Sequence, residues 1–244
     1  MNEEIKMYEE QGNWDFSHID FESEYLNNWN MYDEAKKYLN EKSLILDLGT
    51  GGGENVLSNL KDRVGMIIGT DLSPNMIKTA NENLKKYPNV KAKFVVMDNL
   101  NIEFPDGLFD LVLARNTVIN ASEIFRVLKD DGILIVRGVD KYDCWKLKEL
   151  FGRGQSFNDE TKMSEKDFND IKEEGFKDIQ LKEIDVNEYY KTKEDLLKLL
   201  LKAPILDESS EIPEKDLLEK YVKDHKTEKG ILLERKYYGI IAKK

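Results

Sequence analysis

Four glycines follow a short apolar segment in the stretch LDLGTGGGE, residues 46–54. Glycine inside a regular element costs about 1 kcal/mol relative to alanine, so such a cluster marks a tight turn or a backbone that approaches a ligand closely. A turn of this kind between a strand and a helix exposes backbone N–H groups, and the helix N-terminus favours negative charge. The stretch therefore predicts a ligand platform.

The spacing of these glycines narrows the choice of ligand. A dinucleotide-binding turn follows the pattern G-x-G-x-x-G, whereas here Glu54 stands at the sixth position. A carboxylate at that point would repel a pyrophosphate, and it suits a cationic ammonium or sulfonium group instead. A phosphate-binding P-loop is not present either, because no Lys-Ser or Lys-Thr pair follows the glycines.

Acidic and amide side chains end the next two apolar segments. Asp71 can accept hydrogen bonds from both hydroxyls of a ribose. The alternative is that Asp71 only caps the following helix, although Ser73 already offers a cap there. Asp98 and Asn99 end the third segment, where a side-chain acceptor and a backbone N–H can reach an adenine edge. Together the three positions predict a nucleoside site.

Short apolar segments alternate with amphipathic ones, which is typical of a doubly wound α/β sheet whose parallel strands are buried on both faces. Pro74 stands at a first helical position, where the N–H group that proline lacks would have no partner within the helix. Ser164 and Asp167 resemble a capping box, and Gly175 stands just past the end of that helix. Strands are expected at 43–48, 64–71, 90–98, 109–116, 133–139, 176–186 and 231–244. Helices are expected at 54–60, 73–87, 121–129, 141–151, 164–175, 192–208 and 213–230, with a turn at 130–132.

The first forty residues form an aromatic cap segment, 1–40, which is expected to contain a loop and a helix over 25–39 but no strand. The remaining residues, 41–244, form the main domain, and 186–230 is a helical insertion placed to cover the carboxyl edge of the sheet. The stretch LLKLLLKAPIL is apolar nearly all round. It either packs against the end of the sheet or serves as a lid or dimer face. Trp14, Trp29 and Trp145 are expected in the core.

The motifs ILDLGTGGGE, IIGTDLSPNMIKTA, MDNLNIEFPDGLFDLVLARN and EIFRVLKDDGILIV resemble, in order and spacing, those of class I S-adenosylmethionine-dependent methyltransferases. The resemblance covers residues 42–140 closely. It implies a Rossmann-like, seven-stranded sheet of order 3-2-1-4-5-7-6 with strand seven antiparallel. The implied cofactor residues are Asp47, Gly49, Thr50 and Gly51 at the amino-acid end, Asp71 at the ribose, Leu72 and Met76 beside the adenosine, Asp98 and Asn99 at the adenine, and Arg115 and Asn116 at the methionine moiety or substrate.

Methyl transfer from a sulfonium is an in-line displacement that needs a base only where the acceptor must lose a proton. The sequence identifies no catalytic base. His18 lies in the aromatic cap and can either reach substrate or remain an ordinary surface residue, and His225 is expected to be solvated. Cys144 is expected to be a half-buried thiol, and no metal site is expected.

A net charge of −11 disfavours nucleic acid as a partner. The polar first residues and the lack of a long apolar run predict a cytoplasmic protein without a membrane contact, as monomer or homodimer. The resulting hypothesis is a methyltransferase for a small molecule, with S-adenosylhomocysteine as product. A methyltransferase for RNA or protein, a nicotinamide oxidoreductase and a non-catalytic sensor of the cofactor are the alternatives. The segment ARNTVIN, which stands where an Asn-Pro-Pro-Tyr motif would bind an amide or adenine nitrogen, disfavours those acceptors.

Overall fold

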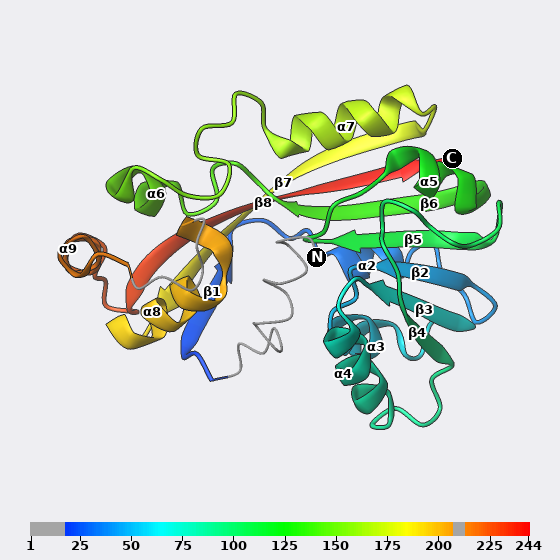
Figure 1. The fold of residues 1–244 in the computed structure, drawn as a ribbon, viewed down its shortest axis with the longest axis horizontal. Helices are drawn as coiled ribbons and strands as arrows, with labels where there is room; N and C mark the ends of the chain where they lie inside the picture. Colours follow the sequence, from blue (N-terminus) through cyan, green and yellow to red (C-terminus); the bar gives the residue numbers. More distant parts are fainter. Residues whose placement is uncertain (1–17, 207–212) are drawn as a thin grey trace.

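The computed structural model describes residues 18–206 and 213–244, which form one eight-stranded sheet with helices on both faces (Figure 1). The strands are β1 (Phe21–Tyr25), β2 (Leu44–Leu48), β3 (Met66–Asp71), β4 (Ala92–Val96), β5 (Phe109–Arg115), β6 (Leu128–Val139), β7 (Lys177–Tyr190) and β8 (Ile231–Lys243). The helices are α2 (Met31–Ala35), α3 (Glu54–Leu60), α4 (Pro74–Leu84), α5 (Ala121–Val127), α6 (Trp145–Phe151), α7 (Met163–Glu173), α8 (Lys193–Lys202), the 3-10 helix η1 (Pro204–Leu206) and α9 (Lys215–Asp224).

The strand order is β1-β7-β8-β6-β5-β2-β3-β4. Neighbours from β4 to β6 pair in parallel, whereas β8 pairs antiparallel with both β6 and β7. Counted without β1, this is the expected order 3-2-1-4-5-7-6 with an antiparallel last strand. The doubly wound α/β fold is therefore confirmed, and the sheet is that of the class I methyltransferase Rossmann-like fold.

The expectation of a seven-stranded sheet with no strand in the cap segment was wrong. β1 pairs antiparallel along the far end of β7, and the ring of Phe21 stacks on that of Tyr190 with centroids 5.1 Å apart. This pairing depends on the length of β7, which offers an open edge beyond the rest of the sheet, and local sequence pattern does not contain that fact. Residues 1–17 and Trp14 lie outside the described residues.

The helix expected over 25–39 is also shorter, because only α2 is helical there. Asn30 caps α2, since its side-chain oxygen accepts hydrogen bonds from the backbone N–H groups of Tyr32 and Asp33. Helix α5 also ends earlier than expected, at Val127, and β6 is longer than expected because it begins directly after α5. The turn expected at 130–132 is part of that strand, and the pairing with β5 shifts register there.

Two helix caps test the local patterns. Ser73 accepts a hydrogen bond from Met76 N–H at the start of α4, as expected. The capping box at Ser164 was wrong, because α7 begins one residue earlier and Ser164 lies inside it. Asp167 instead accepts a hydrogen bond, of 2.5 Å, from the buried hydroxyl of Tyr238 on β8.

The parallel strands are buried between two apolar layers. Helices α5 and α7 cover one face, and α2, α3 and α4 cover the other. Neighbouring residues in register, such as Leu113 on β5 and Ile135 on β6, place their side chains on the α2–α4 face. The last residues of these strands whose side chains point to the α2–α4 face therefore lie together at the carboxyl edge of the sheet.

Strands β7 and β8 continue past this edge into a second half of the molecule, together with β1, α6, α8, α9 and η1 (Figure 1). Its apolar core includes Leu196, Leu199 and Leu200 of α8 and Tyr221 of α9. The packing interpretation of LLKLLLKAPIL is thus supported. The helical insertion is shorter than the expected 186–230, since β7 runs to Tyr190 and α8 begins at Lys193.

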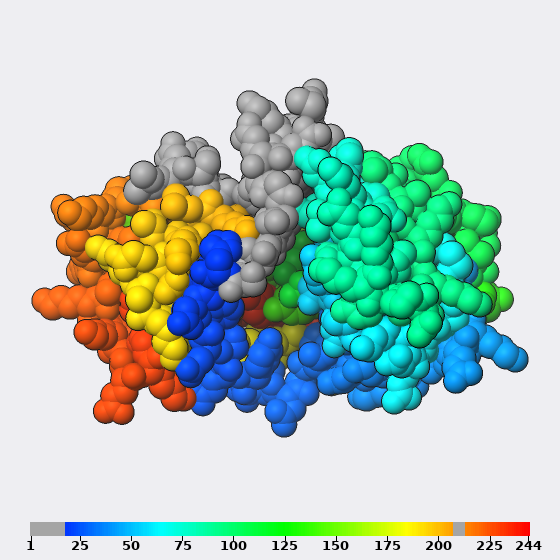
Figure 2. All heavy atoms as spheres, turned by 90° about the horizontal axis from the view of Figure 1, so that it is seen from below, coloured from blue at the N-terminus to red at the C-terminus, as the bar shows by residue number. Residues whose placement is uncertain are grey.

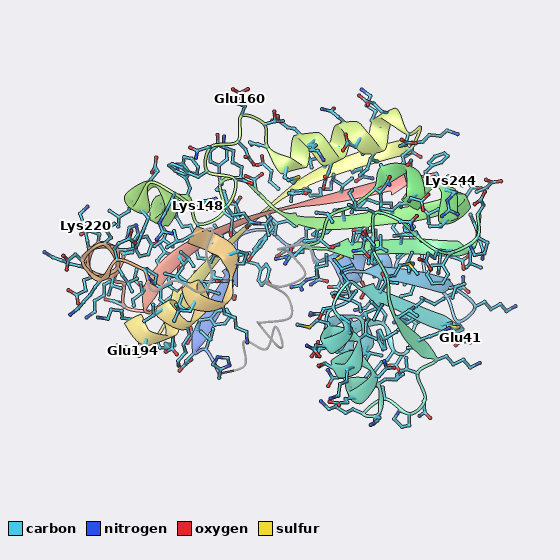
Figure 3. All side chains as sticks on the ribbon, in the orientation of Figure 1. Glu41, Lys148, Glu160, Glu194, Lys220 and Lys244 are labelled. Atoms are coloured by element: carbon cyan, nitrogen blue, oxygen red, sulfur yellow. The ribbon has the colours of Figure 1, made fainter. Side chains whose placement is uncertain are left out.

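The two halves enclose a hollow that opens on the side shown in Figure 2. Glu41 precedes β2 at one end of the molecule, and Glu194 and Lys220 lie at the other (Figure 3). The parallel strands end between these limits, so their carboxyl ends point into the space between the halves (Figure 1). Ligands of open α/β sheets bind at this edge.

Candidate active site

The glycine turn after β2 has the backbone that only glycine adopts freely. Gly49, Gly51 and Gly53 have φ angles of 65°, 56° and 73°. A β-carbon at Gly49 would lie 2.7 Å from that of Thr117, whereas one at Gly51 would meet nothing within 4 Å. Gly49 therefore packs against the loop after β5, and Gly51 borders open space.

Asp71 is tied to this turn. Its Oδ2 accepts a hydrogen bond of 2.9 Å from Gly51 N–H, and its Oδ1 accepts one of 2.9 Å from Ser73 N–H. Burial raises the pKa of Asp71, while the hydrogen bonds from Ser73 and Gly51 lower it. Asp71 does not cap α4, because Ser73 is the N-cap and the bond from Ser73 N–H lies before the helix. Each oxygen keeps a further lone pair for a ligand, because a carboxylate accepts about four hydrogen bonds.

Asp47 is buried beneath the same turn. Its Oδ2 accepts a hydrogen bond of 2.6 Å from Thr50 Oγ1. Burial raises the pKa of Asp47 to about 6, against the lowering effects of the Thr50 hydrogen bond and of Arg115, while Asp71 adds a raising effect. The carboxylate of Asp47 therefore lies within electrostatic reach of both Asp71 and Arg115.

Asn99 lies at the carboxyl edge of the sheet, as predicted, but its side chain is hydrogen-bonded to other residues of the protein. It is buried, its Oδ1 accepts a hydrogen bond from Thr70 Oγ1 (3.1 Å), and its Nδ2 donates one to Thr117 Oγ1 (2.9 Å). Asn99 thus joins β3 to the loops after β4 and β5. Asp98 is exposed and accepts a hydrogen bond from Leu100 N–H.

The other predicted cofactor residues take mixed positions. Met76 is buried on α4, and Leu72 is half-buried before it. Glu54, expected to face a cation, accepts a hydrogen bond of 2.8 Å from the amide of Asn83 on α4. The same amide donates to the carbonyl of Gly52, so the glutamate supports the glycine turn from the α4 side.

Arg115 and Asn116 end β5 next to a residue that sequence reasoning missed, Arg137. Arg115 and Arg137 are opposite each other in the parallel pairing of β5 and β6. Arg137 Nη1 donates a hydrogen bond of 2.8 Å to Asn116 Oδ1, and its guanidinium lies 3.7 Å from the ring centre of Tyr237 on β8. Arg137 lies within the apolar motif ILIVRGV, where a charged residue near the end of a buried strand was the available signal.

Tyr32 of α2 was also missed. Its side chain is buried, and its pKa is raised, first by burial and second by Asp47, while Arg115 and Arg137 act in the opposite direction. The phenol therefore lies within electrostatic reach of Asp47, Arg115 and Arg137. Tyr32, Asp47, Arg115 and Arg137 form one group at the carboxyl edge, which we call the edge cluster.

The histidines and the cysteine lie elsewhere. His18 is exposed near α8, where its backbone carbonyl accepts a hydrogen bond from Lys198. His225 ends α9 and is half-buried, with its ring stacked 4.0 Å from that of Tyr221, so the expectation that it is solvated was wrong. Burial raises the pKa of the Cys144 thiol well above its usual range, which makes it a poor nucleophile.

Residues 18–206 and 213–244 contain no cluster of three or more histidine, cysteine, aspartate or glutamate side chains that could hold a metal ion. Within the same ranges, no helix has the length and apolar character to cross a membrane. A hollow of about 490 Å³, lined in part by Tyr38, Ile179 and Ala242, lies at the amino end of the parallel strands, far from the edge cluster.

Comparison with known proteins agrees with this geometry. Residues 46–136 match a family model described as a methyltransferase domain. The chain is 35% identical over 106 residues to 2-methyl-6-phytyl-1,4-hydroquinone methyltransferase of Synechocystis, covering 41% of this chain and 33% of that protein. It is 35% identical over 108 residues to ribosomal protein L11 methyltransferase of Dictyoglomus thermophilum, covering 43% of this chain and 35% of that one. The chain thus spans about a third of the length of these relatives.

The fold extends further than the sequence similarity. The structure of the YcgJ protein from Bacillus subtilis superimposes with a TM-score of 0.63, covering 88% of this chain and 97% of that one, at 16% identity. At this identity the likeness concerns the fold alone.

Proposed function

We propose that the protein binds S-adenosylmethionine at the carboxyl edge and transfers its methyl group to a small molecule, and the match of residues 46–136 to the methyltransferase domain model supports this. The observation that carries the proposal is the hydrogen bond between Gly51 N–H and the Asp71 carboxylate. It joins the glycine turn after β2 to the acidic end of β3. A nucleoside with an amino-acid tail would therefore meet both in one place.

Each predicted residue has a role that its position supports. The turn at Gly49–Gly51 would hold the amino-acid end, with Arg115 beside it, and the free lone pairs of Asp71 would hold the ribose. Leu72 and Met76 would border the adenosine. Because the Asn99 side chain is already bonded to Thr70 and Thr117, the adenine would meet the Asp98 carboxylate and backbone of this loop rather than the Asn99 amide.

When bound, the cofactor supplies a methyl group on a cationic sulfur that a nucleophile can displace in line. The chain contributes orientation and a site that excludes water. Asp47 places a buried carboxylate below the turn, and its Thr50 hydrogen bond fixes it there. With a pKa of about 6 it is mostly ionised at neutral pH, and its negative charge can offset the cationic ends of the cofactor.

A small-molecule acceptor is favoured over RNA by the net charge of −11, because phosphate-binding surfaces are usually basic. The quinone-type relative supports a small molecule, whereas the L11 relative keeps a protein acceptor as the second candidate. A nicotinamide oxidoreductase is disfavoured by Glu54, which occupies the position of the third glycine in the dinucleotide turn.

The acceptor class is tested by incubating the protein with methyl-labelled S-adenosylmethionine and separate metabolite, protein and RNA fractions of a cell extract. We expect the label in the metabolite fraction. Label confined to protein or RNA would reject the small-molecule proposal while keeping the methyltransferase. Thermal-shift titrations with NAD and with S-adenosylhomocysteine are carried out in parallel. Stabilisation by NAD alone would reject both the methyltransferase activity and the small-molecule acceptor.

A further inference from the structure

Arg137 is a half-buried arginine at the carboxyl edge of the parallel strands. It lies near the end of β6 and shares a sheet face with Arg115, because the two residues pair in parallel register. Both guanidinium groups act on the pKa of the Tyr32 phenol, which each of them lowers. The edge cluster therefore contains two neighbouring positive charges.

Among the described residues neither arginine forms an ion pair, although the Asp47 carboxylate lies within electrostatic reach of Arg115. Three other arginines of the described chain each form ion pairs with carboxylates: Arg126 with Glu123 and Asp106, Arg153 with Glu214, and Arg235 with Asp143 and Glu188. Arg63 is also unpaired, but it is exposed in the turn after α3. Arg137 is half-buried, and both burial and the charge of Arg115 lower its pKa. A half-buried charge without a counter-ion is costly unless an anion binds to it.

The guanidinium of Arg137 is held in place. One of its nitrogens donates to Asn116, and its plane faces the Tyr237 ring at 3.7 Å. Arg235, which is fixed by Asp143 and Glu188, lies 5.2 Å from the centre of the same ring. An arginine oriented in this way can bind a carboxylate or phosphate with two parallel hydrogen bonds at low entropic cost.

The sheet order indicates which ligand would meet it. If the nucleoside lies over β3 and β4 and the amino-acid tail over β2, the reacting end of the cofactor faces β5 and β6. Arg115 lies on β5, which pairs with β2, and it lowers the pKa of Asp47 under the glycine turn, whereas Arg137 lies on β6, on the far side of β5. Arg115 is thus the nearer of the two to the cofactor tail, and Arg137 lies one strand further away.

We propose that Arg137 binds an anionic group, a carboxylate or a phosphate, on the methyl acceptor. This inference rests on the proposed function, and it narrows the acceptor class to molecules that carry such a group. The cofactor approaches the site with a cationic sulfur, so that an anionic acceptor also reduces the repulsion among that charge, Arg115 and Arg137. A cofactor carboxylate bound to Arg137 is the competing source of the same chemistry.

The test uses calorimetric titration of the full chain. Wild type saturated with S-adenosylhomocysteine is titrated with inorganic phosphate and, separately, with acetate in a buffer without other small anions. We expect at least one anion to bind, with at least a tenfold weaker affinity in Arg137→Gln and a smaller loss in Arg137→Lys. The matched control, Arg63→Gln, should bind as wild type does. The affinity of Arg137→Gln for S-adenosylhomocysteine should stay within twofold of wild type.

Three results would overturn the inference. The first is a saturated wild-type complex that binds neither anion, and the second is equal anion affinity in wild type and Arg137→Gln. The third is a tenfold loss of S-adenosylhomocysteine affinity in Arg137→Gln, which would assign Arg137 to the cofactor carboxylate. Should Arg137→Gln fail to fold, Arg137→Lys decides by the same comparison. Wild type that does not bind S-adenosylhomocysteine contradicts the proposed function itself and is thus a distinct outcome.

Discussion

The two halves of the molecule position their polar groups by different means. In the parallel half, the proposed cofactor residues are held by hydrogen bonds between side chains and nearby backbone, as between Asp71 and the N–H groups of Gly51 and Ser73. In the half built on β7 and β8, Arg235 on β8, whose side chain is 11% exposed, forms ion pairs with Asp143 in the turn before α6 and with Glu188 on β7. The first arrangement follows from local turns, and the second depends on residues distant in sequence. The two halves should therefore respond differently to substitution.

The largest expected effect lies in the second half. Asp143→Ala leaves the buried Arg235 with one carboxylate in place of two, and breaking such a pair costs about 3–5 kcal/mol of unfolding free energy. Urea denaturation measures this loss. Glu219→Gln, which removes an exposed ion pair with Lys193, is the control and should change stability little. A similar, small effect for both variants would show that the buried ion pairs do not stabilise this half.

A second comparison tests the glycine turn by its sterics. Gly49 and Gly107 have similar φ angles of 65° and 60°, but an added β-carbon clashes only at Gly49. Gly107→Ala should cost about 1–2 kcal/mol from backbone strain alone, and Gly49→Ala about 2–4 kcal/mol because the clash with Thr117 adds to it. Equal losses in thermal or urea unfolding would argue against the packing of Gly49 on Thr117.

The raised pKa of Asp47 predicts a pH dependence. Its folded pKa of about 6 lies above the unfolded value near 3.8, so the folded state binds more protons between these values and loses stability as the pH rises through them. The total is about 2–3 kcal/mol between pH 4 and 7. Urea denaturation across this range should show the loss in wild type and in the surface control Asp62→Asn, and a smaller loss in Asp47→Asn, where Asp71 and Asp167 still have raised pKa values. Parallel curves for wild type and Asp47→Asn would refute it.

The smallest effects separate stability from binding. Ser73 caps α4 in the first half and Thr192 caps α8 in the second, each accepting a backbone hydrogen bond. Ser73→Ala and Thr192→Ala should each cost about 1 kcal/mol of unfolding free energy. Only Ser73→Ala should weaken S-adenosylhomocysteine binding, because losing the cap loosens the start of α4 and with it the backbone N–H of residue 73, which bonds the Asp71 carboxylate. Weaker binding in Thr192→Ala would show that the halves are coupled.

Sequence reasoning succeeded where chemistry is local. The glycine turn, the place of Asp71 after β3 and the Ser73 cap could be predicted because strand, turn and helix follow one another within a few residues. The sheet order was implied by a family resemblance, and the observed order β7-β8-β6-β5-β2-β3-β4 confirmed it.

It failed where distant residues decide. β1 exists because β7 is long enough to leave an edge, and Asp167 bonds Tyr238 because α7 packs across β8. Arg137 was hidden in an apolar strand motif, and its environment comes from Asn116 and Tyr237, which only folding brings to it. Asn99 was placed at the right edge, but its amide is used by Thr70 and Thr117, which no local pattern indicated.

The account depends on one proposed binding site at the carboxyl edge of the parallel strands. Its most direct test is calorimetric titration of wild type, Asp71→Ala and the control Asp62→Ala with S-adenosylhomocysteine. We expect wild type and Asp62→Ala to bind equally and Asp71→Ala to bind at least tenfold more weakly while remaining folded, because the ribose loses its acceptor. Equal affinity in all three proteins, or no binding to wild type, would contradict the central claim.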